Sequence, residues 1–259
     1  MPGRINVLMA YPGGYLGEPE KLARVCSAAV VACADGAVAP SLLRAGCHAI
    51  CQNDLQATQQ GEITPAEAAR AHTLPMFPQQ RLLRQRRRAS RGHRISHAIF
   101  VGDGHQIYPA FRSDAFREAL RALGVTFDVV DKSRIPEWSD YRDADLVIAL
   151  RPPGSQTEMK PPSKLINAWL AGVPALLGPE PAYQRLRQSP HDYIEVNDVK
   201  EVVATVAQLQ RQPEWYAQML SRCEERAREY SPEAIAAKWA DVLFERIGDW
   251  QEEAAIEMY

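Results

Sequence analysis

The chain has 259 residues and a formal net charge of −2, with 46% hydrophobic and 24% charged residues. That length is enough for one large domain or two modest ones with a real core, and the composition is ordinary for a globular protein. A net charge near zero gives no argument for or against a nucleic acid partner. The most apolar stretch, Ala28–Ala34, is too short to cross a bilayer. We therefore expect a cytoplasmic protein of bacterial type, with a peripheral position at the inner membrane surface as an alternative.

The cysteines indicate neither a disulfide framework nor a zinc site. Their number is odd and no C-x-x-C pair is present, so reduced structural thiols are expected and no metal is predicted. They are Cys26, Cys33, Cys47, Cys51 and Cys223.

The first 95 residues predict a small α/β arrangement. The apolar run Ile5–Ala10 is typical of a buried strand and is closed by Pro12-Gly13-Gly14. Helical periodicity and helix-start signals predict further elements along this part. These are helices over Glu18–Ala34 and Ser41–Ala45, Gly46 at the C-cap of the second, a strand over His48–Cys51, and a helix start at Thr64–Glu67.

A change of composition follows at Arg81–Arg94, which contains seven arginines and no acid. We interpret this run as a solvated, mobile connector at a domain boundary. The alternative is an electropositive surface for a phosphate-bearing partner. Aromatic residues are not interleaved with the arginines, so a stacking platform for single-stranded nucleic acid is disfavoured.

From His97 onward, short apolar strands alternate with amphipathic helices. Several helices are followed by a glycine, as at Gly124 and Gly172. This alternation with tight turns predicts a parallel, doubly wound sheet of Rossmann type. The predicted strands are His97–Val101, Thr126–Val130, Asp145–Leu150, Val173–Leu177 and Tyr193–Val196, and the predicted helices are Ser113–Leu123, Ser163–Ala171, Val199–Gln210, Pro213–Tyr230 and Pro232–Ile247.

The loops after these strands are candidate binding sites, because ligands bind beyond the carboxyl ends of open parallel sheets. The loop Gly102-Asp103-Gly104-His105 follows the first strand. Its glycines let the backbone approach a ligand closely, and a plain tight turn is the alternative. Arg112 can add a positive charge to this loop. Arg151 directly follows the strand Asp145–Leu150 and either serves a ligand or faces solvent.

The segment Lys160–Leu177 carries the most informative signal. Ser163 can cap a helix whose free N–H groups and positive dipole end would face an anion. Lys164 lies in the first turn, where a cation is unfavourable unless a negative ligand is present. Asn167 lies one turn further on. The alternative is that Lys160, Lys164 and Asn167 are ordinary surface residues.

This segment also carries a resemblance to a known family. A helix, then Ala-Gly-Val-Pro-Ala-Leu, then a strand resembles the retaining GT-B glycosyltransferases related to glycogen synthase. The longer segment Lys160–Glu180, with Gly102-Asp103, Asp145–Pro152 and Trp239, is similar to a bacterial branch of family 1 or family 4-like glycosyltransferases. The resemblance covers roughly residues 97 to 245.

The resemblance implies a GT-B-like fold of two Rossmann-like α/β domains with parallel sheets. A reduced acceptor-side domain would span residues 1–95, and a nucleotide-sugar-binding domain would span residues 96–259. The implied activity is that of a hexosyltransferase: a sugar moves from a nucleoside diphosphate sugar, the co-substrate, to a glycan, lipid or small-molecule acceptor, without a metal or another cofactor. The donor-binding residues it points to are Gly102, Asp103, Gly104, Arg112, Arg151, Lys160, Lys164, Asn167 and Glu180.

Two departures from the family pattern bear on catalysis. Met159 and Asn167 hold the positions of the paired glutamates of better-known relatives, and the N-terminal part is short. Both favour an alternative function, a non-catalytic GT-B-like module that binds a nucleotide or sugar. The sequence assigns no catalytic residue, and His105 is the histidine best placed by its loop. A nicotinamide-dependent enzyme is disfavoured because the third glycine of G-x-G-x-x-G is absent after Gly104.

Overall fold

The chain forms two compact α/β units. A computed structural model describes residues 6–10, 29–33, 40–58, 63–75, 78–85, 92–131, 137–152, 155 and 157–247. The first unit contains Met1–Phe77, Gln156–Pro162 and Pro232–Tyr259, and the second contains Pro78–Ser155 and Ser163–Ser231. The predicted bounds, 1–95 and 96–259, divide the chain at a single point, whereas its internal contacts assign non-contiguous segments to each unit.

The first unit is built on a four-stranded parallel sheet in the order β1-β2-β3-β4. The strands predicted near residues 5–10 and 48–51 are present, and β4 was not predicted because three residues carry too little periodicity. The strands are β1 (Asn6–Ala10), β2 (Ala29–Cys33), β3 (His48–Cys51) and β4 (Ala71–Thr73).

The prediction of a helix over Glu18–Ala34 is wrong for its last part. Ala29–Cys33 is β2, the strand that pairs with both β1 and β3. Its sequence, AVVAC, is a five-residue apolar run with two valines, which fits a central parallel strand as well as a helical turn. Residues 18–28 of that predicted helix lie outside the described residues.

Short helices connect these strands. They are α2 (Pro40–Arg44), α3 (Leu55–Thr58) and α4 (Pro65–Ala68). Gly46 follows α2 with φ of 86°, as expected of the residue that ends a helix. Thr64 and Glu67 form the predicted capping box, in which each side chain accepts a hydrogen bond from the other residue's backbone N–H.

The last described element of the first unit is a helix with an irregular end. Its α-helical part, α10 (Pro232–Ala240), continues into a π-helical turn over Asp241–Arg246. Trp239 Nε1 donates to the carbonyl of Pro75 at 3.1 Å, which fastens α10 to the residues after β4. The sequence predicted one regular helix over 232–247 and gave no sign of the π turn.

The second unit contains a five-stranded parallel sheet in the order β6-β5-β7-β8-β9. All five strands were predicted, and β7 is buried along its whole length, as its unbroken apolar sequence requires. The strands are β5 (His97–Gly102), β6 (Thr126–Asp131), β7 (Leu146–Ala149), β8 (Ala175–Leu177) and β9 (Ile194–Glu195).

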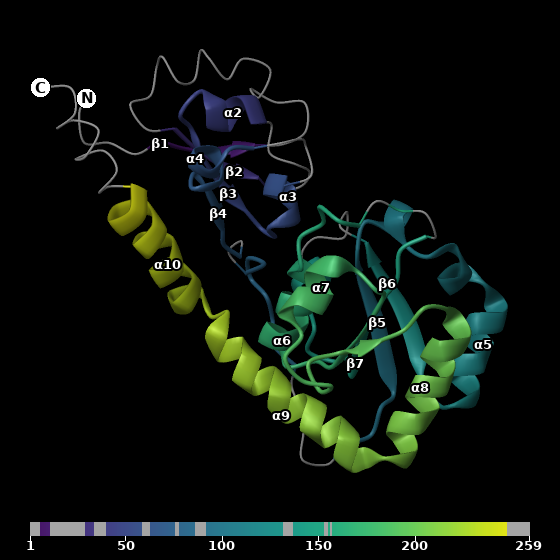
Figure 1. The fold of residues 1–259 in the computed structure, drawn as a ribbon. Helices are drawn as coiled ribbons and strands as arrows, with labels where there is room; N and C mark the ends of the chain where they lie inside the picture. Colours follow the sequence, from purple (N-terminus) through teal and green to yellow (C-terminus); the bar gives the residue numbers. More distant parts are fainter. Residues whose placement is uncertain are drawn as a thin grey trace, which may run out of the picture. The chain divides into compact units, whose positions relative to one another are not determined.

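Helices cover both faces of this sheet, with α5 and α8 on one side and α6 on the other (Figure 1). They are α5 (Asp114–Ala122), α6 (Ser163–Ala171), α7 (Pro181–Leu186), α8 (Val199–Arg211) and α9 (Pro213–Glu229), with the 3₁₀ turns η3 (Gly104–Gln106), η4 (Pro109–Arg112) and η5 (Glu137–Ser139). Ser113 caps α5, while α6 begins at Ser163 itself instead of after it.

The start of the arginine run is bound to the second unit. Leu83 forms a backbone bridge with Asp140, and Gln85 N–H donates to Ala171 O at 2.8 Å. Arg84 forms an exposed ion pair with Glu224. The mobile-connector interpretation is therefore wrong for residues 81–85, while residues 86–91 lie outside the described residues. Among the described residues, no helix is both long and apolar enough to span a membrane.

Candidate functional site

The second sheet has a switch point between β5 and β7. The chain passes from β5 to β6 on one side and then crosses to β7 on the other. Helix α6 follows β7 and leads into β8, so its amino end lies at the same edge as the carboxyl ends of these strands. Ligands of open α/β sheets bind in the crevice at such a switch point.

Gly102 and Lys164 meet across this switch point. A Cβ atom at Gly102 would lie 3.2 Å from Lys164 Cε and 3.4 Å from Lys164 Nζ, so the lysine side chain passes directly over the glycine. Lys164 Nζ also lies 5.6 Å from the centroid of the Phe100 ring. The side chain thus reaches from the first turn of α6 to the end of β5, where its charge adds to the positive helix end.

The loop after β5 is held by two charged side chains. Gly104 N–H donates to Asp131 Oδ2 at 2.5 Å, and Arg112 Nη2 donates to Gly104 O. Asp103 caps the 3₁₀ turn by accepting from His105 N–H at 2.9 Å. The structure therefore brings Arg112 to the loop as predicted, where its guanidinium donates to the backbone carbonyl of Gly104. The loop combines two cations, Arg112 and Lys164, with two carboxylates, Asp103 and Asp131.

Arg151 and Glu180, both predicted to contact the donor, form an ion pair with each other. Arg151 Nε lies 3.0 Å from Glu180 Oε2, and their side chains are only 14% and 6% exposed. Arg151 follows β7 and Glu180 precedes α7 after β8, so the pair joins two neighbouring loops at the carboxyl edge. Burial and the nearby Glu180 carboxylate raise the pKa of Tyr183 well above its ordinary value. Arg151, for which the sequence left open a ligand contact or a solvent-facing position, is thus a partly buried ion-pair partner of Glu180.

Asn167 also has a partner in the protein. Its Nδ2 donates to Gln79 Oε1 at 3.1 Å, and its Oδ1 accepts from Gln79 N–H at 3.3 Å. Gln79 Nε2 in turn donates to Trp138 O at 2.8 Å. Asn167 therefore fastens the segment that opens the second unit onto α6.

Lys160 is part of the first unit, whereas the other predicted donor residues are part of the second. Its carbonyl accepts from Asn53 Nδ2 at 2.9 Å, and the neighbouring Met159 carbonyl accepts from Gln56 Nε2 at 3.1 Å. Asn53 and Gln56 are buried amides directly after β3. In this unit, they fix the backbone of residues 159–160.

The Asp143-Ala144-Asp145 sequence, which has the spacing of a metal-binding Asp-x-Asp motif, has a structural role at the opposite end of β7. Asp145 is fully buried, and its Oδ2 accepts from the backbone N–H groups of Ser96 and His97 at 2.8 and 2.9 Å. Among the described residues, no group of three or more histidine, cysteine or acidic side chains could hold a metal ion.

Three residues of this region escaped the sequence analysis: Phe100, Asp131 and Gln79. Asp131 pairs with Gly102 in the β5–β6 register, and an acid at the end of the apolar run TFDVVD was the one available signal. Phe100 and Gln79 carried none, because their roles depend on contacts with α6.

No protein-family profile and no curated protein match the sequence. Solved structures do match its fold. TarM covers 92% of this chain at 11% identity with a TM-score of 0.59, and HepE of Anabaena in complex with UDP covers 93% at 12% identity with a TM-score of 0.60. The GtfA/B complex covers 93% at 13% identity with a TM-score of 0.61. The chain spans 54% of TarM, 79% of HepE and 57% of the GtfA/B chain.

These likenesses establish the fold class. The chain has the mixed α/β architecture with parallel sheets of the GT-B glycosyltransferases. At identities of 10–13%, the likeness shows the fold alone.

Proposed function

We propose that the second unit binds a nucleoside diphosphate sugar and that the protein transfers the sugar to a glycan, lipid or small-molecule acceptor. The observation that carries this proposal is the placement of Lys164 over Gly102, at the amino end of α6 and the switch point of the sheet. A cation in the first turn of a helix opposes the helix dipole, and a bound diphosphate would reverse that penalty.

The similar folds support the chemical class of this donor. HepE has been solved with UDP and with UDP-glucose, at TM-scores of 0.60 and 0.54. The pneumococcal O-GlcNAc transferase GtfA, at a TM-score of 0.56, has been solved with UDP and GlcNAc.

The chemistry that this site can supply is stabilisation of a leaving diphosphate. Negative charge builds on the diphosphate as the bond to the sugar breaks, and preorganised donors at that position lower the barrier. The groups that we propose for this role are Lys164, the amino end of α6 and Arg112, acting without a metal. The carboxylate of Asp131 would repel the diphosphate and is suited instead to accept from a hydroxyl group.

A non-catalytic module that binds the nucleotide or sugar is the second candidate. It is favoured by the engagement of three residues expected to contact the donor. Arg151 is paired with Glu180, and Asn167 is hydrogen bonded to Gln79. A site that keeps Lys164 for the phosphates but has these three residues paired within the protein would bind a nucleotide without catalysing sugar transfer.

The first test is thermal stabilisation by UDP-, GDP-, dTDP- and CDP-sugars. At about 100 times the Kd, one of these should stabilise the protein by about 2.7 kcal/mol, or about 5–10 °C in Tm. Lys164→Ala should weaken binding about 10–100-fold, because a hydrogen bond to a charged group contributes about 1.5–3 kcal/mol, and the shift should fall accordingly.

Lys200→Ala is the matched control. Lys200 is also the second residue of a helix in the second unit, α8, and is exposed. This variant should keep the full shift. No shift with any donor, or the same loss in both variants, would contradict the donor site. Binding without sugar transfer or donor hydrolysis would favour the non-catalytic module.

A further inference from the structure

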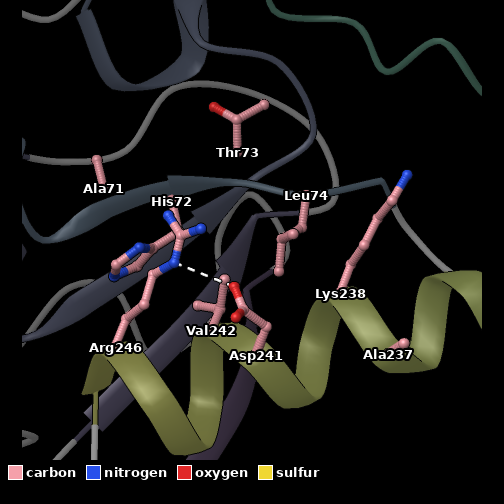
Figure 2. A pocket seen from close by; sticks show the side chains of 9 residues that line it. All are labelled: Ala71, His72, Thr73, Leu74, Ala237, Lys238, Asp241, Val242 and Arg246. Atoms are coloured by element: carbon pink, nitrogen blue, oxygen red, sulfur yellow. Dashed lines mark hydrogen bonds and ion pairs between the residues drawn. The ribbon is translucent and has the colours of Figure 1, made fainter. Parts of the chain in front are cut away.

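The first unit contains a pocket that the proposed donor site does not use. It has a volume of about 410 Å³ and lies between β4 with the following residue and one face of the helix formed by α10 and the π turn (Figure 2). Its lining residues are Ala71, His72, Thr73, Leu74, Ala237, Lys238, Asp241, Val242 and Arg246. We call it the β4–α10 pocket.

The π turn brings Arg246 close to Asp241, five residues earlier, at the edge of this pocket. In an α-helix, residues five apart point about 140° away from each other, because each residue turns by about 100°. In the wider π turn, Arg246 Nε lies 3.1 Å from Asp241 Oδ2 (Figure 2). Such turns are rare in helices and are frequent at functional sites.

The walls of the pocket combine donors with an apolar base. Lys238 and Arg246 bring two positive charges from the helix, and His72 brings an imidazole ring from β4, whereas the hydroxyl group of Thr73 points away from the helix (Figure 2). Asp241 offsets one of the charges through the exposed pair with Arg246, whose side chains are 53% and 64% exposed. Val242 and Leu74 are buried beneath these polar groups. A guanidinium and an ammonium, with an imidazole beside them, match an anion with several oxygens.

His72, which lines one side of the pocket, is paired with a second histidine, His48. His72 Nε2 lies 3.1 Å from His48 Nδ1, and the two rings stack with centroids 5.4 Å apart. Burial and the nearby charge of Arg246 lower the pKa of His72. The cost of a second positive charge beside Arg246 would be removed by a bound anion, which would allow His72 to take up a proton and donate to that anion.

We propose that the β4–α10 pocket binds a phosphate monoester through Lys238, Arg246 and His72. This site lies wholly within the first unit and is independent of the proposed donor site in the second. The phosphate can belong to a soluble metabolite or to a lipid headgroup, and the experiment distinguishes these sources.

The test follows the His72 ring in the full-length protein by NMR, with the signal assigned by its loss in His72→Gln. Titration with inorganic phosphate should shift this signal in a saturable way and raise the pKa of His72. Lys238→Gln/Arg246→Gln should weaken the effect at least about tenfold, because each lost charged hydrogen bond contributes about 1.5–3 kcal/mol. Asp241→Asn should strengthen phosphate binding, because it removes the one acid of the pocket wall.

Matched controls keep this test separate from the donor site. Lys200→Gln/Arg211→Gln removes the same charge from exposed positions on α8 and should leave the phosphate response of His72 unchanged. Lys164→Ala should also leave it unchanged, so the donor site can fail while this one stands. A His72 signal that does not respond, or that responds equally in Lys238→Gln/Arg246→Gln, overturns the proposal.

Two further arms identify the source of the phosphate. Glycerol 3-phosphate should reproduce the effect of inorganic phosphate if the ligand is a soluble monoester. Stronger binding to phosphatidylcholine vesicles that contain phosphatidic acid than to pure phosphatidylcholine vesicles, lost in Lys238→Gln/Arg246→Gln, identifies a lipid monoester. Vesicle binding that the double variant retains contradicts this pocket as the site.

Discussion

Gly102 is under two separate constraints. Its φ of 156° is rare for residues with a side chain, and a Cβ atom there would press on both Lys164 and Phe100 at 3.2 Å. The side chain of Lys164 can give way only by leaving its position over the loop. The glycine is therefore needed both for the backbone conformation and for the placement of the cation.

Gly102→Ala should cost about 1–3 kcal/mol of stability and remove most of the donor-induced shift, because the lysine is displaced. Gly124→Ala is the control: Gly124 has φ of 71° but nothing within 4 Å of an added Cβ. It should show backbone strain of about 1–2 kcal/mol in urea unfolding and keep the donor shift. If Gly102→Ala kept the full shift, the close contact with Lys164 would not matter for binding.

Positions of single residues were predictable where the strand pattern determined them. Gly102, Arg112 and Lys164 lie at the carboxyl edge because each ends a strand or lies in the connection after one, and the parallel sheet fixes the direction of those strands. The partners of Arg151, Asn167 and Glu180 were not predictable. Each partner is a residue distant in the sequence, and the local sequence pattern around either residue does not indicate the pairing.

At the scale of elements, α6 is anchored by its packing on α9. Trp169 of α6 is fully buried, and its Nε1 donates to Asp192 O at 2.8 Å. Arg226 of α9 is 1% exposed and lies 4.4 Å from the Trp169 ring and 5.3 Å from the Tyr230 ring. Its Nη1 also pairs with Glu229 at 2.6 Å. This cluster holds the helix that carries Lys164.

Arg226→Ala should therefore destabilise the second unit by about 3–5 kcal/mol, since it removes one partner of a buried charged cluster and the packing on Trp169. Arg228→Ala removes an exposed arginine from the same helix and should change stability by less than about 0.5 kcal/mol. Urea unfolding followed by tryptophan fluorescence measures both. Equal effects of the two substitutions would show that the Arg226 cluster does not stabilise the unit.

The elements themselves were largely predictable, because strands and helices of the second unit have distinct periods and glycines close the helices. The failures have physical causes. The run AVVAC of β2 is too short for its period to separate strand from helix. The π turn at Asp241–Arg246 was not predictable, because its sequence DVLFER is an ordinary helical one.

At the scale of the whole molecule, each unit is assembled from non-contiguous segments. The first unit takes its helix α10 from the end of the described chain and its sheet from the beginning. The sequence predicted two α/β domains but placed one boundary at the arginine run. A change of composition marks a solvent-facing stretch, whereas the return of the chain to an earlier unit leaves no such mark.

The stability of the first unit should depend on pH through its histidine pair. His48 is 5% exposed, and burial together with the neighbouring His72 and Arg70 lowers its pKa from 6.5 to about 4. The pKa of His72 is lowered as well. A histidine that resists protonation when folded but accepts a proton when unfolded contributes stability above pH 6.5, and this is lost progressively as the pH falls toward 4.

The free energy of unfolding of the first unit should thus fall between pH 7 and 5, by at most about 1.4 kcal/mol per pH unit for each histidine. Hydrogen exchange of the amides in β3 and β4, converted to opening free energies, measures this loss apart from β5 and β7 of the second unit. His48→Gln should flatten the dependence, whereas His93→Gln, at an exposed position, should preserve it. If acid destabilised β3 and β4 equally in the wild type and His48→Gln, another titrating group would be responsible, because no other change separates these two proteins.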